Sequence, residues 1–478
     1  MVNKIIIILL VLLGLLILVF NFSDIFLRSP DVSEEQEIVY GKLSELIFDG
    51  PVHRSEYYFI SINGERYSLS EENYFNLMSQ ADKNDFVYVD ASSLRTDSNS
   101  ESQYFDDVFL QPIQPVQPAQ PSFVRLPGIA LPSPPSNLGE QKVIVILGAD
   151  NNQTQNLISP AGYNSILSNE VNNFVKENSF NQTWLKVNVS GWHVRNLSDG
   201  CFIDNAVKFA DPFVDYGQYD TIIVVSSCTP PGSASAFLGP TLIKTSDGLI
   251  YTRIIFLPLY FSNLQPRAIV AHEMGHGFGL DHASAFVNCN PPFHIGGRRY
   301  CQALDYGDPF DTMGETYYSL NSSPHYSARH KNEIGWMNSL RINSSQSNVS
   351  ILIKPLEFSR QGSVYIHSYE NETFPCPGCI DYFYSLDYRL PVGLDAINDS
   401  SWPPVKQGVY IRYHHSYQAQ PNMRIQTNQG LIDTHHQTPT LADSYLVMGE
   451  NYTDYVNRII FKVNSMSSNG ANVSITKF

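Results

Sequence analysis

The sequence predicts a multidomain α+β protein, in which a larger α/β unit is flanked by a small N-terminal β-domain and a C-terminal β-sandwich-like domain. Three observations predict this class. Apolar runs alternate with helical patterns over residues 139–340, as in an α/β layer. A proline-rich stretch, 111–138, separates this region from short strand patterns at 31–110. Short strand patterns without a convincing helix return over 341–478, which is typical of a sandwich.

The composition is that of a folded chain suited to export. Hydrophobic residues make up 43% of the 478 residues, and a prior of roughly 150 residues per domain suggests about three units. Charged residues make up only 16%, below the ~25% of an average soluble protein. The net charge is −16 and Lys and Arg are not clustered, which argues against nucleic acid as a partner.

An apolar run at the N-terminus predicts that the rest of the chain is exported. Residues 5–20 are all apolar, and the apolar pattern continues to residue 27 with a polar interruption. Two interpretations of segment 1–28 stay open, an uncleaved transmembrane anchor and a cleaved signal segment. The anchor is favoured, because the run exceeds the apolar core of a signal peptide and no Ala-x-Ala-like cleavage site follows. It would place the protein at the cell surface, with the membrane as a partner.

Two further features agree with export. Twelve Asn-x-Ser/Thr sequences occur, which predicts a glycoprotein. The number of cysteines is even, and in an exported protein this predicts disulfide bonds. Pairing by proximity would join Cys201 with Cys228, Cys289 with Cys301 and Cys376 with Cys379, although the spacing does not fix the connectivity. A zinc or redox site at Cys376-x-x-Cys379 is the alternative.

The N-terminal β-domain and the linker differ clearly in composition. Residues 31–110 alternate apolar and polar positions in short stretches, and Asn63-Gly64 is a strong hairpin signal. The linker 111–138 repeats Gln-Pro and should form an extended polyproline spacer, because proline fixes φ and removes hydrogen-bond donors. The linker is therefore the clearest boundary in the chain.

The α/β unit is expected to contain buried strands and helices in alternation. The apolar runs 142–147, 221–225 and 251–257 are short and bounded by polar residues, as buried strands are. The run 251–257 could be an edge that pairs with an extended substrate, or it could lie inside the sheet. A helical pattern covers 163–175, and another helix is expected from Pro266, because proline suits a first helical turn.

Residues 272–282 read His-Glu-Met-Gly-His-Gly-Phe-Gly-Leu-Asp-His and carry the chemistry. On a helix, His272 and His276 lie about one turn apart on nearly the same face, so both imidazoles can point at one metal ion. Glu273 lies on the same side, where it can reach a water at the metal. A continued helix would carry His282 roughly 15 Å from His272. Gly279 predicts the helix end, because glycine adopts positive φ without strain, and the turn lets His282 reach the same ion.

This extended pattern is specific. With each residue at about one in twenty, His-Glu-x-x-His would occur by chance in roughly 6% of chains this long, and Gly279 and His282 lower this to on the order of 10⁻⁴. A buried helix with incidental histidines would need other polar partners for three imidazoles and a carboxylate. The pattern therefore predicts a three-histidine zinc site with a fourth position open to water.

These residues resemble the metzincin clan of zinc endopeptidases, and the region 272–336 looks like its gametolysin-like branch. The resemblance rests on the histidine pattern and on Asp311-Thr312-Met313-Gly314, and it is looser over 140–271. It implies that Met313 packs under the histidines without binding the metal. Some clan members place a tyrosine ligand two residues after this methionine. Glu315 occupies that position here, so no tyrosine ligand is expected.

The resemblance implies a zinc-dependent endopeptidase that cleaves extracellular or cell-surface proteins. His272, His276 and His282 would hold Zn²⁺, and Glu273 would act as general base toward a metal-activated water. Some metzincins are kept latent by a cysteine, but no cysteine precedes Cys201. The domain at 31–110 could be a propeptide that blocks the site with a carboxylate or by steric cover, or a permanent stalk.

Other interpretations of the function stay open. The chain could be a surface adhesion or binding protein on a protease-like scaffold, although metal binding alone does not need Glu273. It could also be a zinc hydrolase that acts on a linkage other than a peptide bond. Asp305, Asp308 and Asp311 could bind Ca²⁺, but their glycine and proline neighbours favour a shaped loop. The expected partner is a protein or peptide substrate, and the oligomeric state does not follow from the sequence.

Overall fold

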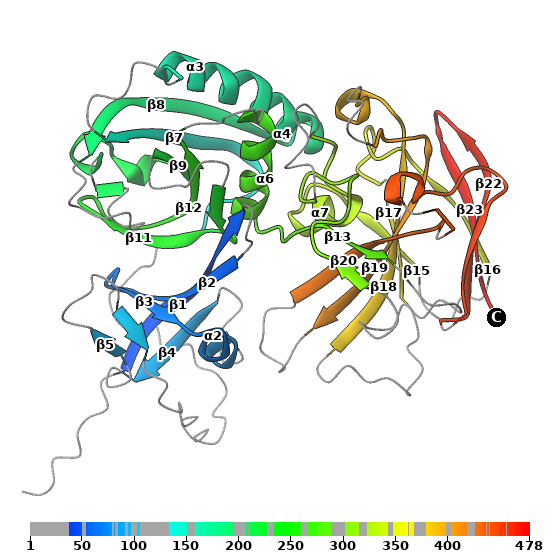
Figure 1. The fold of residues 1–478 in the computed structure, drawn as a ribbon, viewed down its shortest axis with the longest axis horizontal. Helices are drawn as coiled ribbons and strands as arrows, with labels where there is room; N and C mark the ends of the chain where they lie inside the picture. The colour runs from blue at the N-terminus through cyan, green and yellow to red at the C-terminus, as the bar shows by residue number, and fades with distance from the viewer. Residues whose placement is uncertain are drawn as a thin grey trace, which may run out of the picture.

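The computed structural model describes most of the chain from residue 38 onward. Within the described residues the protein is mostly β, with sheets of twelve, seven and four strands. Figure 1 separates an N-terminal unit, a central unit with most of the helices, and a C-terminal unit. The described residues are 38–49, 54–78, 81, 85–90, 94–96, 103–105, 133–150, 158–195, 207–208, 210–226, 234–259, 266–287, 302–314, 323–342, 348–361, 363–367, 379–397, 403–417, 426–435, 437–438, 440–455 and 457–478.

The central unit is built around parallel strands. β7 (Gly139–Asp150) pairs in parallel with β8 (Thr183–Arg195) and with β9 (Thr221–Ser226), and β9 pairs in parallel with β12 (Gly248–Pro258). β7, β9 and β12 contain the apolar runs that the sequence predicts as buried strands, so this prediction is confirmed. On its other side β12 pairs antiparallel with β10 (Ala234–Phe237), so β12 is an interior strand.

Helices pack on one face of these strands. α3 (Pro160–Ser165), the π-helical η3 (Ile166–Val171) and α4 (Asn172–Asn178) follow one another and confirm the helix expected at 163–175. α6 (Pro266–Phe278) begins at the expected proline.

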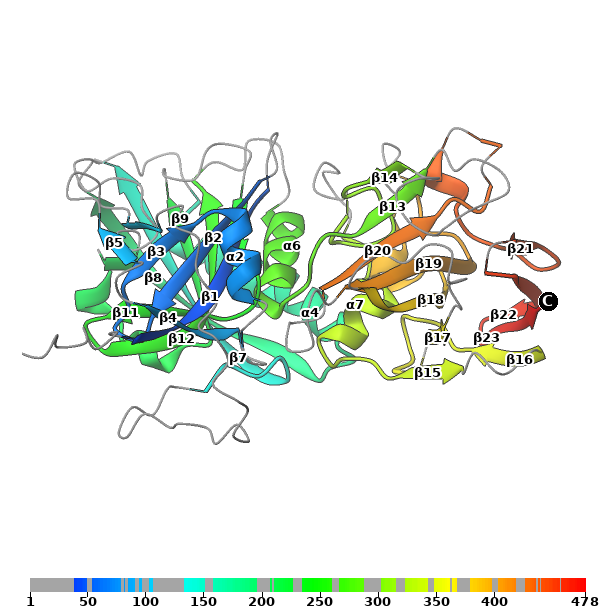
Figure 2. The same cartoon turned by 90° about the horizontal axis from the view of Figure 1, so that it is seen from below.

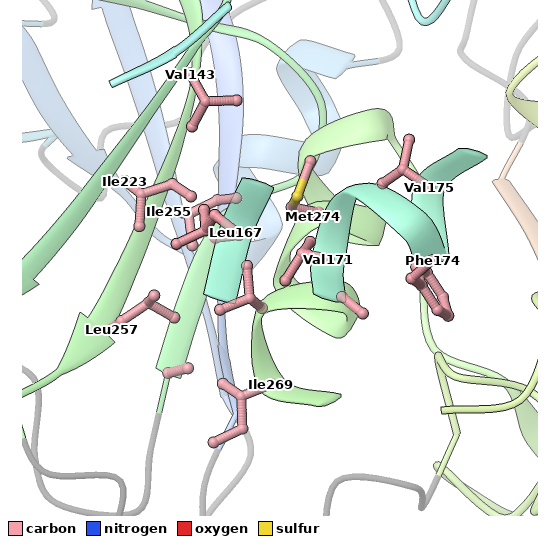
Figure 3. Packing of buried hydrophobic residues seen from close by; sticks show 14 of the residues in the cluster. Val143, Leu167, Val171, Phe174, Val175, Ile223, Ile255, Leu257, Ile269 and Met274 are labelled. Atoms are coloured by element: carbon pink, nitrogen blue, oxygen red, sulfur yellow. The ribbon is translucent and has the colours of Figure 1, made fainter. Parts of the chain in front are cut away.

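Apolar side chains fix α6 against the sheet. Figure 3 shows Ile255 of β12 beside Leu167 of η3. Both residues, together with Leu257 of β12 and with Ile269 and Met274 of α6, belong to one buried cluster. Burying a side chain of this size stabilises the fold by about 1.5–3 kcal/mol. The position of α6, which carries the histidine pattern, is therefore set by the core.

The N-terminal unit contains the strands expected over 31–110. β1 (Ile38–Asp49) pairs with β2 (Arg54–Ser61), and β2 forms the expected hairpin with β3 (Arg66–Leu69) at Asn63-Gly64, where Gly64 has a φ of 79°. The sequence did not predict α2, which packs its apolar side chains into the core of this unit. The remaining elements are α2 (Glu71–Met78), β4 (Phe86–Asp90), β5 (Leu94–Thr96) and β6 (Gln103–Phe105).

The N-terminal and central units share one continuous sheet. β1 pairs antiparallel with β10, so the strand order runs β5-β6-β3-β2-β1-β10-β12-β9-β7-β8, with β4 beside β1 and β11 (Thr241–Thr245) beside β12. Figure 2 shows the blue strands β1 and β2 running toward the green helix α6. The end of β1 thus reaches the region of the histidine pattern.

The C-terminal unit consists of the seven-stranded and the four-stranded sheet. Apolar residues of both sheets, including Tyr384, Ile411, Phe461 and Val473, form one buried cluster. Two short strands that precede residue 341, β13 (Ser284–Val287) and β14 (Gln302–Leu304), belong to the larger sheet. A short helix, α7 (Ala328–Glu333), leads into it. The other strands are β15 (Ser339–Ile342), β16 (Asn348–Ile353), β17 (Ser363–His367), β18 (Cys379–Arg389), β19 (Gly408–Tyr417), β20 (Gln426–Ile432), β21 (Asn451–Asp454), β22 (Ile459–Ser467) and β23 (Gly470–Lys477).

The prediction of a membrane-anchored protein needs correction. A membrane span needs about 20 consecutive apolar residues, and none of the helices in the described part of the chain has that length and apolarity. The transmembrane helix, the membrane as a partner and the anchored location at the cell surface are therefore not retained. Segment 1–28, on which they rested, lies outside the described residues, as do the proline-rich residues 111–132 and the side chains of all six cysteines.

Candidate metal centre

Helix α6 brings His272 and His276 to one side, as their one-turn spacing predicts. Their ring centroids are 4.9 Å apart, and both side chains are fully buried. The helix ends at Gly279, whose φ of 103° lies where glycine meets no steric penalty. The amide of Gly279 donates to the carbonyl of His276 at 2.8 Å, and the amide of Leu280 donates to the carbonyl of Gly275 at 2.9 Å. The chain thus leaves the helix in a tight, fully hydrogen-bonded turn.

This turn returns His282 to the other two histidines. Its ring centroid lies 4.7 Å from that of His276 and 5.5 Å from that of His272. The Nε2 atoms of His276 and His282 are 3.1 Å apart. The structure thus brings the three imidazoles together after the bend at Gly279.

Backbone carbonyls orient two of the rings. The Nδ1 atom of His272 lies 2.8 Å from the carbonyl oxygen of Thr312, and Nδ1 of His276 lies 2.8 Å from that of Leu280. Because a carbonyl oxygen only accepts, both Nδ1 atoms carry the hydrogen, and the lone pairs of the Nε2 atoms point into the group. This is the tautomer that a metal-binding histidine needs.

The sequence did not identify Asp49, the fourth member of the group. Asp49 is the last residue of β1 and is fully buried. Its Oδ2 lies 3.3 Å from Nε2 of His272 and 3.2 Å from Nε2 of His276, and its Oδ1 lies 3.0 Å from Nε2 of His282. Burial alone would raise the pKa of Asp49, but the three histidines lower it well below its usual value.

The donor set fits a metal ion. One oxygen of Asp49 and one ring nitrogen of each histidine all lie within 4.8 Å of one another. Four donors bound to zinc at about 2.0–2.1 Å would be roughly 3.3 Å apart, as the corners of a tetrahedron. The separations of 3.0–3.3 Å between the carboxylate and the imidazoles are close to this value. The buried group of Asp49, His272, His276 and His282 could therefore hold a metal ion.

Glu273 follows His272 on α6 and is also fully buried. Neither of its carboxylate oxygens receives a hydrogen bond from a donor among the described residues. Burial, together with the nearby Asp49 carboxylate, raises the pKa of Glu273 well above its usual value. Glu273 is therefore a buried carboxylate next to this group of histidines and outside its donor set.

Met313 lies directly against the helix that carries the histidines. A Cβ atom added at Gly275 would lie 2.2 Å from the sulfur of Met313, so the thioether fills the space that the glycine leaves. The Asp311 side chain accepts a hydrogen bond from the amide of Met313 at 2.9 Å. Thr312 of the same loop orients the ring of His272, so this loop contacts both the helix at Gly275 and the imidazole of His272.

Tyr306 is a second residue that sequence reasoning missed. Its hydroxyl donates a hydrogen bond to Oδ1 of Asp49, and its ring centroid lies 3.6 Å from that of His282. Tyr306 has a φ of 56°, which is uncommon for a residue other than glycine. The Oδ1 atom of Asp305 holds this bend by accepting from the Tyr306 amide at 3.1 Å. In the sequence, Tyr306 could have been singled out only by its position at the start of the stretch 306–313, which ends at Met313.

The C-terminal unit supports the same loop. Arg412 of β19 donates from Nε to Asp308 at 2.6 Å, and Arg389 of β18 donates to the carbonyl of Phe310. Asp311, a second of the three carboxylates named as possible Ca²⁺ ligands, contacts Nδ1 of His330 at 2.8 Å. Asp308 and Asp311 therefore contact protein cations or donors, as expected for a shaped loop.

Comparisons with known proteins found no protein family whose model matches the chain and no curated protein that matches its sequence.

Proposed function

We propose that this protein is a zinc-dependent endopeptidase of the metzincin type, in which His272, His276 and His282 hold the metal and Glu273 is the general base. The observation that carries the proposal is the convergence of the three imidazoles, with His276 and His282 Nε2 atoms 3.1 Å apart, beside a buried carboxylate that is not needed as a ligand. The central unit would be the catalytic domain, and the C-terminal unit would be a sandwich-like module that supports it.

Zinc is the metal we propose because the donor set is rich in imidazole and compact. Three histidines with one open position are typical of catalytic zinc sites. A zinc ion in this place supplies Lewis acidity, which polarises a peptide carbonyl and makes a water molecule more acidic.

The chain's own residues would do the remaining work. Glu273 is placed to take a proton from the attacking water and to deliver it to the leaving amine. The carbonyls of Thr312 and Leu280 hold the rings of His272 and His276 in place. The hydroxyl of Tyr306 donates a hydrogen bond to the carboxylate of Asp49. If a substrate oxygen replaced this carboxylate, the same hydroxyl would be placed to donate to that oxygen.

The proposal is tested with purified full-length protein. We expect the full-length protein to bind one equivalent of zinc. After the N-terminal unit has been cut from the chain, we expect cleavage of casein or of a peptide library, and loss of this cleavage when a zinc chelator is added. Glu273→Gln should keep zinc and lower the rate by about 10²–10⁴-fold, the usual contribution of a general base. The matched control is Glu170→Gln, which changes an exposed glutamate on η3 and should keep full activity.

The alternatives make different predictions in the same assays. A non-catalytic binding protein would hold zinc and cleave no peptide in any form. A zinc hydrolase for another linkage would cleave no peptide but would act on glycan or cell-wall preparations in a Glu273-dependent way. Equal activity of wild type and Glu273→Gln would rule out the proposed mechanism.

A further inference from the structure

The outer edge of the central sheet is already paired. β10 is the last strand of the central unit on this side, and its free edge is covered by β1. The pairing is antiparallel over four residues, with Leu46 opposite Phe237 and Asp49 opposite Ala234. It continues beyond β10, where the amide of Leu238 donates to the carbonyl of Glu45 at 2.9 Å. An extended peptide that binds a sheet edge uses the same backbone groups.

This edge runs beside the metal centre. The amide of Gly239, just after β10, donates to the carbonyl of His276 on α6 at 2.8 Å. A strand bound along β10 therefore passes the histidines. β1 follows this path and ends at Asp49, whose two oxygens contact all three histidines.

Other contacts hold the N-terminal unit in place. The hydroxyls of Ser44 and Thr241 are 2.8 Å apart and buried. The rings of Phe86 and Tyr251 meet edge to face with centroids 6.3 Å apart. Leu46 belongs to a buried cluster with residues of β11 and β12. The N-terminal unit thus packs against β11 and β12 of the central unit, and these contacts help to hold β1, and with it Asp49, in position.

From these contacts, and resting on the proposed endopeptidase function, we infer that β1 occupies the substrate path. An extended substrate would pair antiparallel with β10 in the direction of β1, and the carboxylate of Asp49 takes the position at the metal that water and the scissile carbonyl would need. The N-terminal unit is therefore an inhibitor built into the chain. Activity requires that Asp49 and β1 leave together, for example after a cut between the N-terminal and central units.

The ligand role of Asp49 is tested by spectroscopy on the full chain, without any activity measurement. Co²⁺ replaces zinc in wild type, in Asp49→Asn and in Glu45→Gln. Glu45 is the matched control, because it is a carboxylate on the same strand that is not part of the metal group. We expect wild type and Glu45→Gln to share one visible spectrum and Asp49→Asn to differ in band position and intensity. Identical spectra for all three would overturn the ligand role.

The occupied substrate path is tested by cutting the chain. A recognition sequence for a site-specific protease is inserted within residues 111–132, and the zinc-loaded protein is assayed before and after the cut. An inhibitor tethered in the same chain acts at an effective concentration in the mM range, so we expect cutting and removal of the N-terminal unit to raise peptide cleavage about tenfold or more. A protein that cleaves peptide, and does so equally fast before and after separation, would overturn the inference.

A synthetic peptide with the sequence of residues 42–49 gives a third readout. It should inhibit the cut protein, and the same peptide with Asn in place of Asp49 should inhibit about tenfold less, because it lacks the carboxylate. Equal inhibition by both peptides would contradict the role of the carboxylate. If Asp49→Asn changes the Co²⁺ spectrum but no cut form cleaves any peptide, the inhibitor contact stands and the proposed endopeptidase function fails.

Discussion

The sulfur of Met313 occupies the space where a Cβ atom on Gly275 would lie, at 2.2 Å from that position. Gly275 stands on α6 between His272 and His276, so this contact joins the helix that carries these histidines to the loop that contains Met313. Any side chain at residue 275 must displace the thioether of Met313, whose neighbour Thr312 orients His272.

Gly275→Ala is therefore expected to weaken metal binding. Overpacking a buried site costs about 1–3 kcal/mol, and the gain in helix propensity of about 1 kcal/mol offsets only part of this. The control is Gly277→Ala on the same helix, where the nearest atom to an added Cβ lies at 3.4 Å and room exists. Thermal unfolding and zinc competition with a chelator should show a loss for the first variant and none for the second. Equal zinc affinity for both variants would contradict the prediction.

Gly279→Ala should separate His282 from the other histidines. Its φ of 103° costs an alanine about 1–3 kcal/mol, so the turn should relax and carry His282 away. Gly449→Ala provides the same backbone strain in the C-terminal unit, at a φ of 91° with open space around the added Cβ. Both variants should lose stability, but only Gly279→Ala should lose zinc affinity, as measured by calorimetry. A zinc affinity unchanged in Gly279→Ala would mean that the turn does not position His282.

Tyr306→Phe should lower kcat in the activated protein by about 10- to 100-fold, with zinc content unchanged. The reason is the loss of one hydrogen-bond donor at the reacting oxygen. Tyr216→Phe also removes a buried hydroxyl that donates to a backbone carbonyl, that of Val207 at 2.8 Å, but it lies outside the metal group. Tyr216→Phe should cost about 1 kcal/mol of stability and leave kcat unchanged. Similar kinetics for wild type and Tyr306→Phe would remove the tyrosine from the mechanism.

Glu357→Gln tests a pH dependence that is independent of the metal. Burial, and the charge of Asp395, raise the pKa of Glu357 from 4.5 to about 9. The folded protein therefore holds a proton on Glu357 that the unfolded chain releases above about pH 4.5, so wild type loses stability as the pH rises, by up to about 1.4 kcal/mol per unit. Gln does not titrate. The advantage of the variant in free energy of unfolding should grow by roughly 2 kcal/mol between pH 5 and pH 7.

The window for this measurement ends at pH 7, because burial lowers the pKa of the nearby Lys331 to about 7, and above that pH most of the Lys331 side chain is neutral. Glu333→Gln, at the surface beside Arg329, is the control and should change unfolding equally at both pH values. A constant difference between Glu357→Gln and wild type would show that Glu357 is charged in the folded state throughout.

The part of the site that the sequence could predict is local. His272, His276, Gly279 and His282 lie within one helix and the turn that follows it, so helical geometry and the conformational freedom of glycine determine their arrangement. The strands β7, β9 and β12 were predictable for a similar reason, since each is a short apolar run.

The rest depends on contacts between distant segments. Asp49 reaches the metal group only because β1 pairs with β10 in one register, and a shift of that register by one residue would turn the carboxylate to the other face of the sheet. In the turn at Tyr306 the positive φ falls on the tyrosine and not on Gly307 beside it, which the sequence does not indicate. Helix α2 is short and mostly polar on one side, so its pattern resembles the loops around it.

The pairing of β13 with β20 determines where this protein can be shortened. β13 begins two residues after His282, and it lies between β14 and residues 430–432 of β20. A recombinant fragment that stops at residue 340 would keep β14 but would leave the other edge of β13 without β20 and Asp308 without Arg412. The smallest fragment that folds around the metal group should therefore extend through the C-terminal sheets, and these sheets should not be exchangeable as an independent module.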